Sequence, residues 1–412
     1  MKYIVNGDLV LSRAPEGPLA THVGGFARWA SEQGYPRYSR YRQVLLATCF
    51  SRWLGRRLIG VRQVSSEQVF RYLRSRARRG RRRRDDAAAL RQFVDFLRRG
   101  GVIPAEKITP TRLTPIEHVV QAFEQYLRVD RALACATVVN YRFFIRRFLT
   151  DRFGRGPVSL SQLQARDIMR YVQRQAPRLH LKRAKLLTTA LRSFLRYARY
   201  HGILTQDLTA AVPAVANWSM SAIPRAIAPD AVHQLLASIN RGTVRGRRDY
   251  AILLLLARLG LRAGEVASLE LDDLDWEAGH VTVRGKRGVR AALPLPADVG
   301  AAVARYLRRG RPRSPSRRVF LRTHAPIRGF AGASAIDNVV GRAIEHAAIQ
   351  APTKGAHQFR HGLATQMLRR GASLTEIGEI LRHRSVETTT IYAKVDLDGL
   401  RTLALPWPGG AR

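Results

Sequence analysis

Apolar residues recur at helical spacing through the first half of the chain. In the stretches 26–54 and 119–149 they fall every three or four positions, and arginines occupy the other faces. This pattern is typical of amphipathic helices that pack against one another. Each stretch lies in a segment of about 100 residues whose pattern predicts about four helices.

The two helical segments also resemble each other in sequence. Five short matches recur in one order after 96 to 101 residues. They are His22-Val23 with His118-Val119, Tyr41-Arg42 with Tyr141-Arg142, Arg71-Tyr72 with Arg170-Tyr171, Leu90-Arg91-x-Phe93 with Leu191-Arg192-x-Phe194, and Gly101-Val102-Ile103 with Gly202-Ile203-Leu204. Arginine-rich helical segments can share such pairs by chance, but five matches in the same order favour a duplicated helical domain.

The pattern changes after residue 207. Alanine, valine and proline dominate Leu208 to Pro229, which predicts a linker. Beyond it the periodicity predicts several helices and one hairpin. The helices span Asp230 to Ile239, the apolar stretch that follows Asp249 and ends near Gly260, 299–308, 333–348, 359–370 and 375–382; the hairpin spans His280 to Leu295 with its turn at Gly285 to Gly288. Asp230 is expected to cap the first helix, and Ser373 with Glu376 to form a capping box at the last one.

These elements predict a multidomain, mainly α-helical protein with a small β-hairpin or sheet in its last domain. A chain of 412 residues, 46% of them hydrophobic, can bury the cores of about two to four domains. We assign residues 1–110 and 111–207 to two helical domains, 208–224 to the linker, and 225–412 to a carboxyl-terminal domain with a tail.

The chain carries a large excess of positive charge. Its 71 basic and 30 acidic residues give a formal net charge of +41, which is typical of proteins that neutralise many backbone phosphates. A nucleic acid is therefore the expected partner, although a ribosomal or chromatin-packing protein would show the same charge. Nine arginines lie between Arg71 and Arg84. They are expected to form a loop that touches phosphates without reading sequence.

The cysteines and the apolar runs indicate a cellular compartment. Cys49 and Cys135 lie far apart and have no metal-ligand spacing, which argues against a zinc ribbon or a disulfide framework and favours a reducing compartment. The amino terminus has no apolar run of signal-peptide length, and the longest apolar run, Ala251 to Ala257, is too short to span a bilayer. The protein is expected in the cytoplasm, on nucleoid DNA, with no membrane partner.

Six residues in the last third have the chemistry needed to break a phosphodiester without a metal ion. They are Arg262, Lys286, His357, Arg360, His383 and Tyr392. Such a reaction needs a nucleophile, cations around the non-bridging oxygens, and an acid for the leaving oxygen. An arginine fork can hold two phosphate oxygens, and a lysine can give up a proton that a guanidinium keeps.

Each of these residues also has an ordinary interpretation. Arg262 alone could be a surface arginine, but Leu261 and Glu265 predict an ordered turn in which the carboxylate orients the guanidinium. Lys286 could be an exposed lysine at the hairpin tip. His357 and Arg360 share one face of a helix because they are three residues apart. Tyr392 follows a threonine-rich stretch that predicts an accessible phenol, on a short helix that Ser385 caps.

Two neighbouring patterns resemble a zinc site and a nucleotide-binding loop, but neither has the residues that such a site needs. His361, four residues after His357, could complete a zinc pair, but Gln358 stands where a metalloprotease has glutamate and a third ligand is not apparent. His361 is therefore expected to be a structural hydrogen-bonding residue. The segment GHVTVRGK lacks the glycine spacing and the Ser or Thr of a P-loop. Neither a metal ion nor another cofactor is expected.

The carboxyl-terminal motifs resemble the tyrosine recombinase family, of the phage integrase type. The resemblance covers Pro224 to Leu405 and rests on GLRAGEVASL, the lysine hairpin, HQFRHGLAT and LRHRSVETTTIY in the order and spacing of that family. It implies that the five cationic residues and histidines activate the scissile phosphate, and that Tyr392 attacks it to leave a 3′-phosphotyrosine and a free 5′ hydroxyl. Rejoining then needs no ATP, because the phosphotyrosine keeps the phosphodiester energy.

The resemblance also implies roles outside the six residues. Residues Leu113 to Leu204 look like the core-binding domain, which clamps DNA opposite the catalytic domain, whereas the copy at 19–104 is either a second clamp or an arm-site binder. Two positions depart from the family pattern. Arg382 replaces the usual glycine before the histidine, and Phe359 replaces the usual leucine.

The expected activity is site-specific recombination of double-stranded DNA by a homo-multimer, a tetramer on DNA, through a four-way junction. Partner recombinases, the target site, and the choice among integration, excision, transposition and dimer resolution stay open. So does whether the tail after Tyr392 docks on its own subunit or on a neighbour. A type IB topoisomerase and a catalytically silent, recombinase-derived DNA-binding protein are the alternatives.

Overall fold

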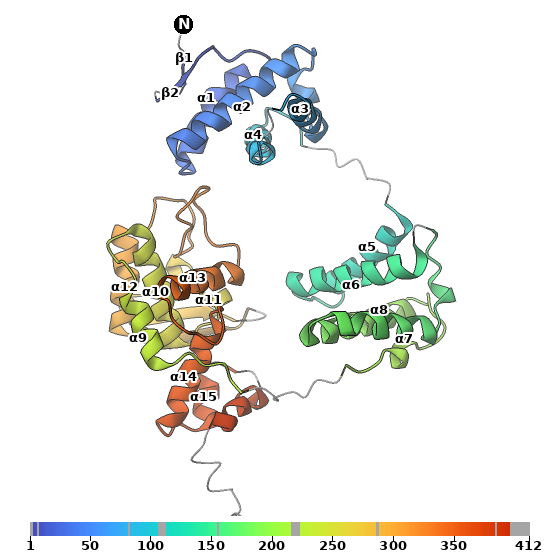
Figure 1. Cartoon of the computed structure of the whole chain (residues 1–412), viewed down its shortest axis with the longest axis vertical. Coiled ribbons are helices and arrows are strands. Elements are labelled where there is room, and N and C mark those ends of the chain that lie inside the picture. Colours follow the sequence, from blue (N-terminus) through green and yellow to red (C-terminus); the bar gives the residue numbers. More distant parts are fainter. Residues whose placement is uncertain are drawn as a thin grey trace, which may run out of the picture. The chain divides into compact units, whose positions relative to one another are not determined.

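Helices make up most of the chain (Figure 1). The computed structural model describes residues 3–5, 8–80, 83–105, 113–154, 156–215, 223–285, 288–383 and 385–395. One compact unit contains Met1–Glu106 and Ala222–Arg412, and the other is Lys107–Ser221. In the described part of the chain, no helix is both long and apolar enough to cross a membrane.

The amino-terminal segment consists of a small hairpin and four α-helices. The strands are β1 (Tyr3–Val5) and β2 (Leu9–Leu11), and the helices are α1 (Val23–Glu32), α2 (Arg37–Gly55), α3 (Ser66–Arg78) and α4 (Asp86–Arg99). Apolar residues at helical spacing, such as Val44, Ala47, Phe50 and Leu54 on α2, face one core. Four of the nine arginines predicted to form a loop, Arg71, Arg74, Arg76 and Arg78, lie on α3, so the prediction was wrong for these four. Arg79, Arg83 and Arg84 follow the helix, and Arg81 and Arg82 lie outside the described residues.

The second unit repeats this order of elements. Its helices are α5 (Pro115–Val129), α6 (Cys135–Phe153), α7 (Ala165–Gln175) and α8 (Leu181–Tyr200). In both segments a short 3-10 turn, Val61–Gln63 or Leu160–Gln162, precedes the third helix. A duplication would produce this correspondence. Leu208 and Val212, in the segment assigned to the linker, are buried in the core of this unit, so the start of that segment packs on the helices.

The carboxyl-terminal segment packs helices around one central helix. Its α-helices are α9 (Pro229–Ala237), α10 (Val244–Leu259), α11 (Ala263–Ser268), α12 (Ala297–Arg309), α13 (Ala333–His346), α14 (His357–Arg369) and α15 (Leu374–Ile380). Every residue of Ala251 to Leu256 is buried, because α10 contacts α9, α11, α12, α13 and α14. A helix covered on all sides needs this continuous apolar run.

A three-stranded antiparallel sheet completes this segment. Its order is β3 (Leu274–Asp275), β4 (His280–Arg284), β5 (Arg290–Pro294), and Arg284 pairs with Arg290 next to the turn. The predicted hairpin is therefore confirmed over the described strands. The mainly α fold with a small sheet is confirmed as well.

The first two helices of this segment begin differently from the prediction. The first helix begins with Pro229, whose fixed φ suits the first helical position, so Asp230 lies in the first turn and Ala228 precedes it as the cap. The central helix begins at Val244, five residues before Asp249, and the Thr243 hydroxyl accepts a hydrogen bond from the Gly246 amide at 2.9 Å. The capping box of Ser373 and Glu376 is present as predicted.

Candidate active site

Arg360 lies one turn into α14 and is almost completely buried, at 1% exposure. Its guanidinium donates to the Gly260 carbonyl at 2.7 Å and to the Leu381 carbonyl. A buried charge requires such partners. Burial, together with the charges of Arg262 and Arg382, lowers the pKa of Arg360 to about 10. Arg360 therefore remains a cation that lacks a full counter-charge.

Gly260 makes the first of these contacts available. It ends α10 in the left-handed region, with φ +55°, and a Cβ there would lie 2.9 Å from Leu381 Cδ2 and 3.0 Å from Leu363 Cδ2. Glycine is required because it adopts this conformation readily and leaves the space free. The reversal of the chain directs the Gly260 carbonyl towards Arg360.

Arg262 and Arg382 share one buried carboxylate, that of Glu265. Glu265, 4% exposed, accepts hydrogen bonds from the Arg262 amide at 2.9 Å, from the Arg262 guanidinium at 2.7 Å and from the Arg382 guanidinium at 3.0 Å. Arg262 also donates to the Arg382 carbonyl at 3.2 Å. The expectation that Glu265 orients Arg262 is confirmed. Because Arg360 adds a third guanidinium, the cluster has an excess of positive charge, which suits a phosphate.

Arg382 is held in an unusual backbone conformation. Its φ is +56°, in the left-handed region where a residue with a Cβ is strained. Its Nε and one terminal nitrogen are buried, and neither meets a hydrogen-bond acceptor among the described residues. The ion pair with Glu265 is therefore the contact that stabilises this side chain.

His383 follows directly and is held by two contacts. Its backbone amide donates to the Gly378 carbonyl at 2.8 Å, and its Nδ1 lies 2.7 Å from the Thr389 hydroxyl. Burial, together with the charges of Arg360 and Arg262, lowers the pKa of His383 to about 4. The ring is therefore neutral at neutral pH.

Tyr392 is buried, at 1% exposure, so the prediction of an accessible phenol was wrong. Its ring packs with Ala364, Ile377 and Leu381, and its hydroxyl lies 3.0 Å from Nδ1 of His361. Burial raises the pKa of Tyr392 to about 12. The predicted single short helix is two 3-10 helices, Val386–Thr388 and Thr390–Val395, and Ser385 makes no side-chain cap bond.

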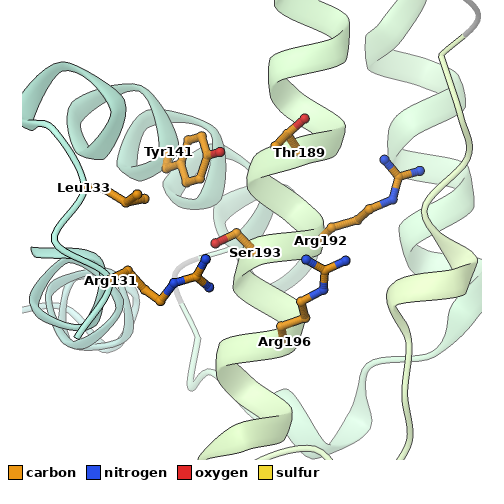
Figure 2. Close-up of a pocket in the computed structure, with 7 residues that line it drawn as sticks. All are labelled: Arg131, Leu133, Tyr141, Thr189, Arg192, Ser193 and Arg196. Atoms are coloured by element: carbon orange, nitrogen blue, oxygen red, sulfur yellow. The ribbon is translucent and has the colours of Figure 1, made fainter. Parts of the chain in front are cut away.

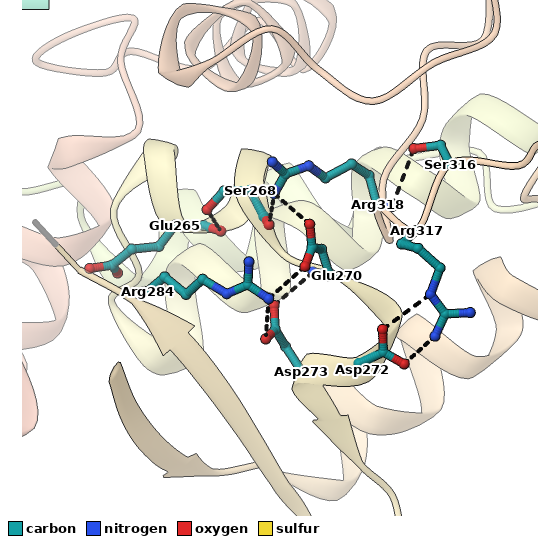
Figure 3. Close-up of polar contacts among 9 residues, drawn as sticks. All are labelled: Glu265, Ser268, Glu270, Asp272, Asp273, Arg284, Ser316, Arg317 and Arg318. Atoms are coloured by element: carbon teal, nitrogen blue, oxygen red, sulfur yellow. Dashed lines mark hydrogen bonds and ion pairs between the residues drawn. The ribbon is translucent and has the colours of Figure 1, made fainter. Parts of the chain in front are cut away.

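The hairpin that contains Lys286 is anchored below its turn. Lys286 itself lies outside the described residues. Arg284, at the end of β4, lies 2.5 Å from a carboxylate oxygen of Glu270 and 3.0 Å from one of Asp273 (Figure 3). The two carboxylates fix the strand that leads into the lysine turn.

Comparison with known proteins identifies the family. Residues 225–398 match the phage integrase family, and residues 120–202 match the N-terminal SAM-like domain of phage integrases. Over all 412 residues the chain is 56% identical to the whole of a putative integrase/recombinase, y4rA, of Sinorhizobium fredii (strain NBRC 101917 / NGR234). The chain belongs to the phage integrase family.

Other members of the phage integrase family are more distant. The tyrosine recombinase XerD of Listeria monocytogenes serotype 4b (strain F2365) is 30% identical over 287 residues, which cover 67% of this chain and 94% of XerD. The structure of XerH bound to a palindromic difH substrate has a TM-score of 0.56 at 19% identity and covers 70% of this chain and 84% of XerH. A lambda integrase (75-356) dimer bound to a COC′ core site has a TM-score of 0.51 at 17% identity. The match covers 71% of this chain and 99% of the lambda integrase chain. These two structures share the fold.

This member of the phage integrase family is therefore a tyrosine-type site-specific recombinase. It cleaves and rejoins DNA through a covalent 3′-phosphotyrosine, as the family resemblance implied. Neither the type IB topoisomerase nor the silent DNA-binding protein is favoured by any observation on this integrase.

The fold of this integrase brings most of the predicted residues together. Arg262 and Arg360 meet at Leu381 and Arg382, and the ring of His383 lies parallel to that of Tyr392, with centroids 6.3 Å apart. His357 begins α14, and its ring centroid lies 4.4 Å from that of His361. Among the described residues, no group of three or more His, Cys, Asp or Glu is placed to hold a metal ion.

Three residues that help to form the site were not among the six predicted site residues. His361 was expected to form a structural hydrogen bond, and its partner turns out to be Tyr392. Arg382 was recognised as a departure from the family pattern but not as a partner of Glu265. The anchoring of Arg284 gave no signal in the sequence, because Glu270 and Asp273 lie on a separate segment.

Proposed function

We propose that Tyr392 is the nucleophile of this recombinase and that five residues bind and activate the scissile phosphate. These five are Arg262, Lys286, His357, Arg360 and His383. The observation that carries the proposal is the convergence of Arg262 and Arg360 on Leu381 and Arg382, next to His383 and Tyr392. Such a cluster has the cations and the phenol that a phosphotyrosine reaction needs.

The contacts support a different role for each of these residues. The Arg262 side chain is 35% exposed and therefore can reach a phosphate while Glu265 holds it. Arg360 is buried and supplies charge beneath the site. We assign the proton of the neutral His383 ring to Nε2, from which it can donate to the phosphate, with Nδ1 accepting from the Thr389 hydroxyl. We assign proton donation to the leaving 5′ oxygen to Lys286, because an ammonium can release a proton.

The buried phenol implies a rearrangement on DNA. Tyr392 lies on Thr390–Val395, a 3-10 helix that follows another, Val386–Thr388. Short 3-10 helices have weaker hydrogen bonding than α-helices. We propose that this segment shifts when the phosphate binds, so that the hydroxyl meets phosphorus.

We propose that the helical domains at 1–110 and 111–207 clamp double-stranded DNA. A pocket of about 270 Å³ in the second unit supports this proposal (Figure 2). Three arginines, Arg131, Arg192 and Arg196, line it together with polar side chains, which suits a backbone phosphate. We place the protein on nucleoid DNA in the cytoplasm.

We also propose that the chain works as a homo-multimer whose active form on DNA is a tetramer. An assembly that includes partner recombinases is the alternative. Solved relatives support it: one structure is a lambda integrase dimer bound to a core site, and another is a lambda integrase tetramer bound to a Holliday junction. Strand exchange through a four-way junction needs four tyrosines, one for each strand that is cut.

A trapping experiment tests the nucleophile. Duplexes are selected from a random-sequence library by binding to the full chain, their protected region is mapped by footprinting, and a nick is placed just 3′ of each candidate scissile phosphate. Loss of the short 5′-hydroxyl fragment should leave a covalent protein–DNA complex on a denaturing gel. Tyr392→Phe should abolish this complex, and Tyr306→Phe, at a tyrosine buried elsewhere in the same segment, should retain it. A complex that persists in Tyr392→Phe refutes the assignment.

A further inference from the structure

The Tyr392 hydroxyl has a specific side-chain partner. Nδ1 of His361 lies 3.0 Å from it, and the two ring centroids are 5.7 Å apart at 65°. His361 directly follows Arg360 on α14, so the same helical turn carries this imidazole and a guanidinium of the phosphate-binding cluster. The contact joins residues that are 31 positions apart in the chain.

The charge states leave both partners of this hydrogen bond neutral. Burial, together with the charges of His357 and Arg360, lowers the pKa of His361 to about 4. The imidazole is therefore neutral at neutral pH. Because the pKa of Tyr392 is raised to about 12, the phenol keeps its proton. In the imidazole tautomer that has its proton on Nε2, Nδ1 accepts the hydrogen bond from this phenol.

Other groups near the phenol are less suited to accept its proton. His383 has its Nδ1 engaged with Thr389 at 2.7 Å, and its ring lies parallel to the phenol ring at 6.3 Å. Arg360 is a cation whose terminal nitrogens donate to backbone carbonyls. Nδ1 of His361, in contrast, lies within hydrogen-bonding distance of the hydroxyl.

We propose that His361 is a catalytic residue that holds the Tyr392 hydroxyl and accepts its proton when the scissile phosphate is bound. This inference rests on the proposed role of Tyr392 as nucleophile. The hydroxyl proton moves to Nδ1 as the phenol oxygen bonds to phosphorus and the bond to the 5′ oxygen breaks. The 5′ oxygen takes a proton from the acid assigned to Lys286. In rejoining, the 5′ hydroxyl attacks phosphorus and returns its proton to Lys286, while the departing tyrosine oxygen recovers its proton from His361.

Binding of the DNA phosphate should raise the pKa of His361, which the proton transfer requires. His357 and Arg360 on α14, and His383 after α15, surround the imidazole and phenol, and Arg262 adds its charge to the cluster. Without DNA, burial and the nearby positive charges keep His361 neutral. A phosphate anion beside the arginines offsets their charge, so the pKa of His361 rises and proton transfer becomes easier. The free protein therefore keeps its nucleophile protonated.

Two matched substitutions separate proton acceptance from packing. His361→Asn places an amide oxygen near the position of Nδ1, so it can accept the hydrogen bond but not the proton. His361→Gln places its amide near Nε2 and serves as the comparison. Thermal unfolding of both variants is compared with that of the wild-type protein. Binding to the selected duplex is measured as well, and the affinity of neither variant should differ from that of wild type by more than about twofold.

The substrates are two nicked duplexes that differ in one atom. One carries the ordinary 5′ oxygen at the scissile phosphate, and the other carries a bridging sulfur there. A thiolate leaves without a proton, so the sulfur substrate needs no leaving-group acid. His361→Asn should form the covalent complex at least about 100-fold more slowly than wild type on both substrates. Lys286→Ala should be slow with oxygen and recover with sulfur.

Three results would contradict the proposal. Cleavage of the sulfur substrate by His361→Asn within about threefold of the wild-type rate would exclude His361 as the proton acceptor. Recovery of His361→Asn by sulfur alone would assign His361 to the leaving group. A defect as large in His357→Asn but absent in His361→Asn would assign the proton to His357.

The wild-type protein provides a further measurement if the variants fail to fold. On the sulfur substrate, the rate should fall as the pH decreases through the pKa of His361 in the complex, and it should be slower in D₂O. A rate that is independent of pH between 5 and 8 and of the isotope would overturn the proposal. Tyr392→Phe is the control: a covalent complex in that variant refutes the nucleophile itself, whereas its absence together with normal His361→Asn kinetics refutes this inference alone.

Discussion

Arg262 and Arg360 bind consecutive backbone carbonyls, those of Arg382 and Leu381. Two arginines almost 100 residues apart therefore hold one short segment, which leads directly into His383. The cations proposed to bind phosphate also position the next part of the site. Loss of either arginine should then affect the fold as well as the chemistry.

Arg360→Ala should destabilise the carboxyl-terminal segment by about 2–5 kcal/mol, because it leaves two buried carbonyls, of Gly260 and Leu381, without their donor. Chemical unfolding of the full chain measures this loss. Arg258→Ala, at an exposed arginine paired with Asp298 on the surface, should change stability by less than about 0.5 kcal/mol. Equal stabilities for the two variants would show that the carbonyl contacts contribute little.

Arg382→Gly and Arg382→Ala should differ in stability. Both remove the ion pair with Glu265, but alanine keeps the cost of the left-handed φ of +56° and glycine does not. The glycine variant should therefore be more stable than the alanine variant by about 1 kcal/mol. Chemical unfolding of both variants tests this order, and a more stable alanine variant would argue against strain at this position.

The sequence predicted the helices better than it predicted the site. Periodicity placed α12 to α15 within a few residues, because their apolar faces follow a regular spacing. It missed the first turn of α10, where Arg248 is buried and donates to the Leu321 carbonyl, 73 positions away. Such a tertiary contact offsets the cost of burying a polar residue, and local pattern does not contain it.

The nucleophile illustrates the same limit. Threonines before Tyr392 suggested an exposed segment, yet Thr389 is buried and holds His383. A polar residue can be buried once its hydroxyl has a partner, and that partner lies on another turn. Spacing identified which residues belong to the site, while burial and the contact with His361 depend on how α14, α15 and the last 3-10 helices pack.

Acidification should destabilise the protein between pH 6.5 and pH 4. His361 and His383 have folded pKa values of about 4, below the ordinary value of 6.5. In that window the unfolded chain binds more protons, so stability increases with pH, by at most about 1.4 kcal/mol per pH unit for each histidine and by less where solvent screens it. Thermal unfolding across this range should show a smaller slope for His361→Asn than for wild type. His233→Asn, at an exposed residue of α9, should retain the full slope, and a slope unchanged in His361→Asn would contradict the lowered pKa.

Arg284→Ala should impair the leaving-group step without impairing attack by the tyrosine. Glu270 and Asp273 hold Arg284 at the end of β4, two residues before Lys286, so loss of this anchor should loosen the position of the lysine. Cleavage of the oxygen substrate should slow by about tenfold or more, whereas the bridging-sulfur substrate should be cleaved within about threefold of the wild-type rate, because it needs no acid. Arg317→Ala is the matched control, since Arg317 pairs with Asp272 where both side chains are exposed (Figure 3), and it should leave both rates unchanged. An equal loss on both substrates would mean that Arg284 supports the whole site, or DNA binding, instead of the lysine turn.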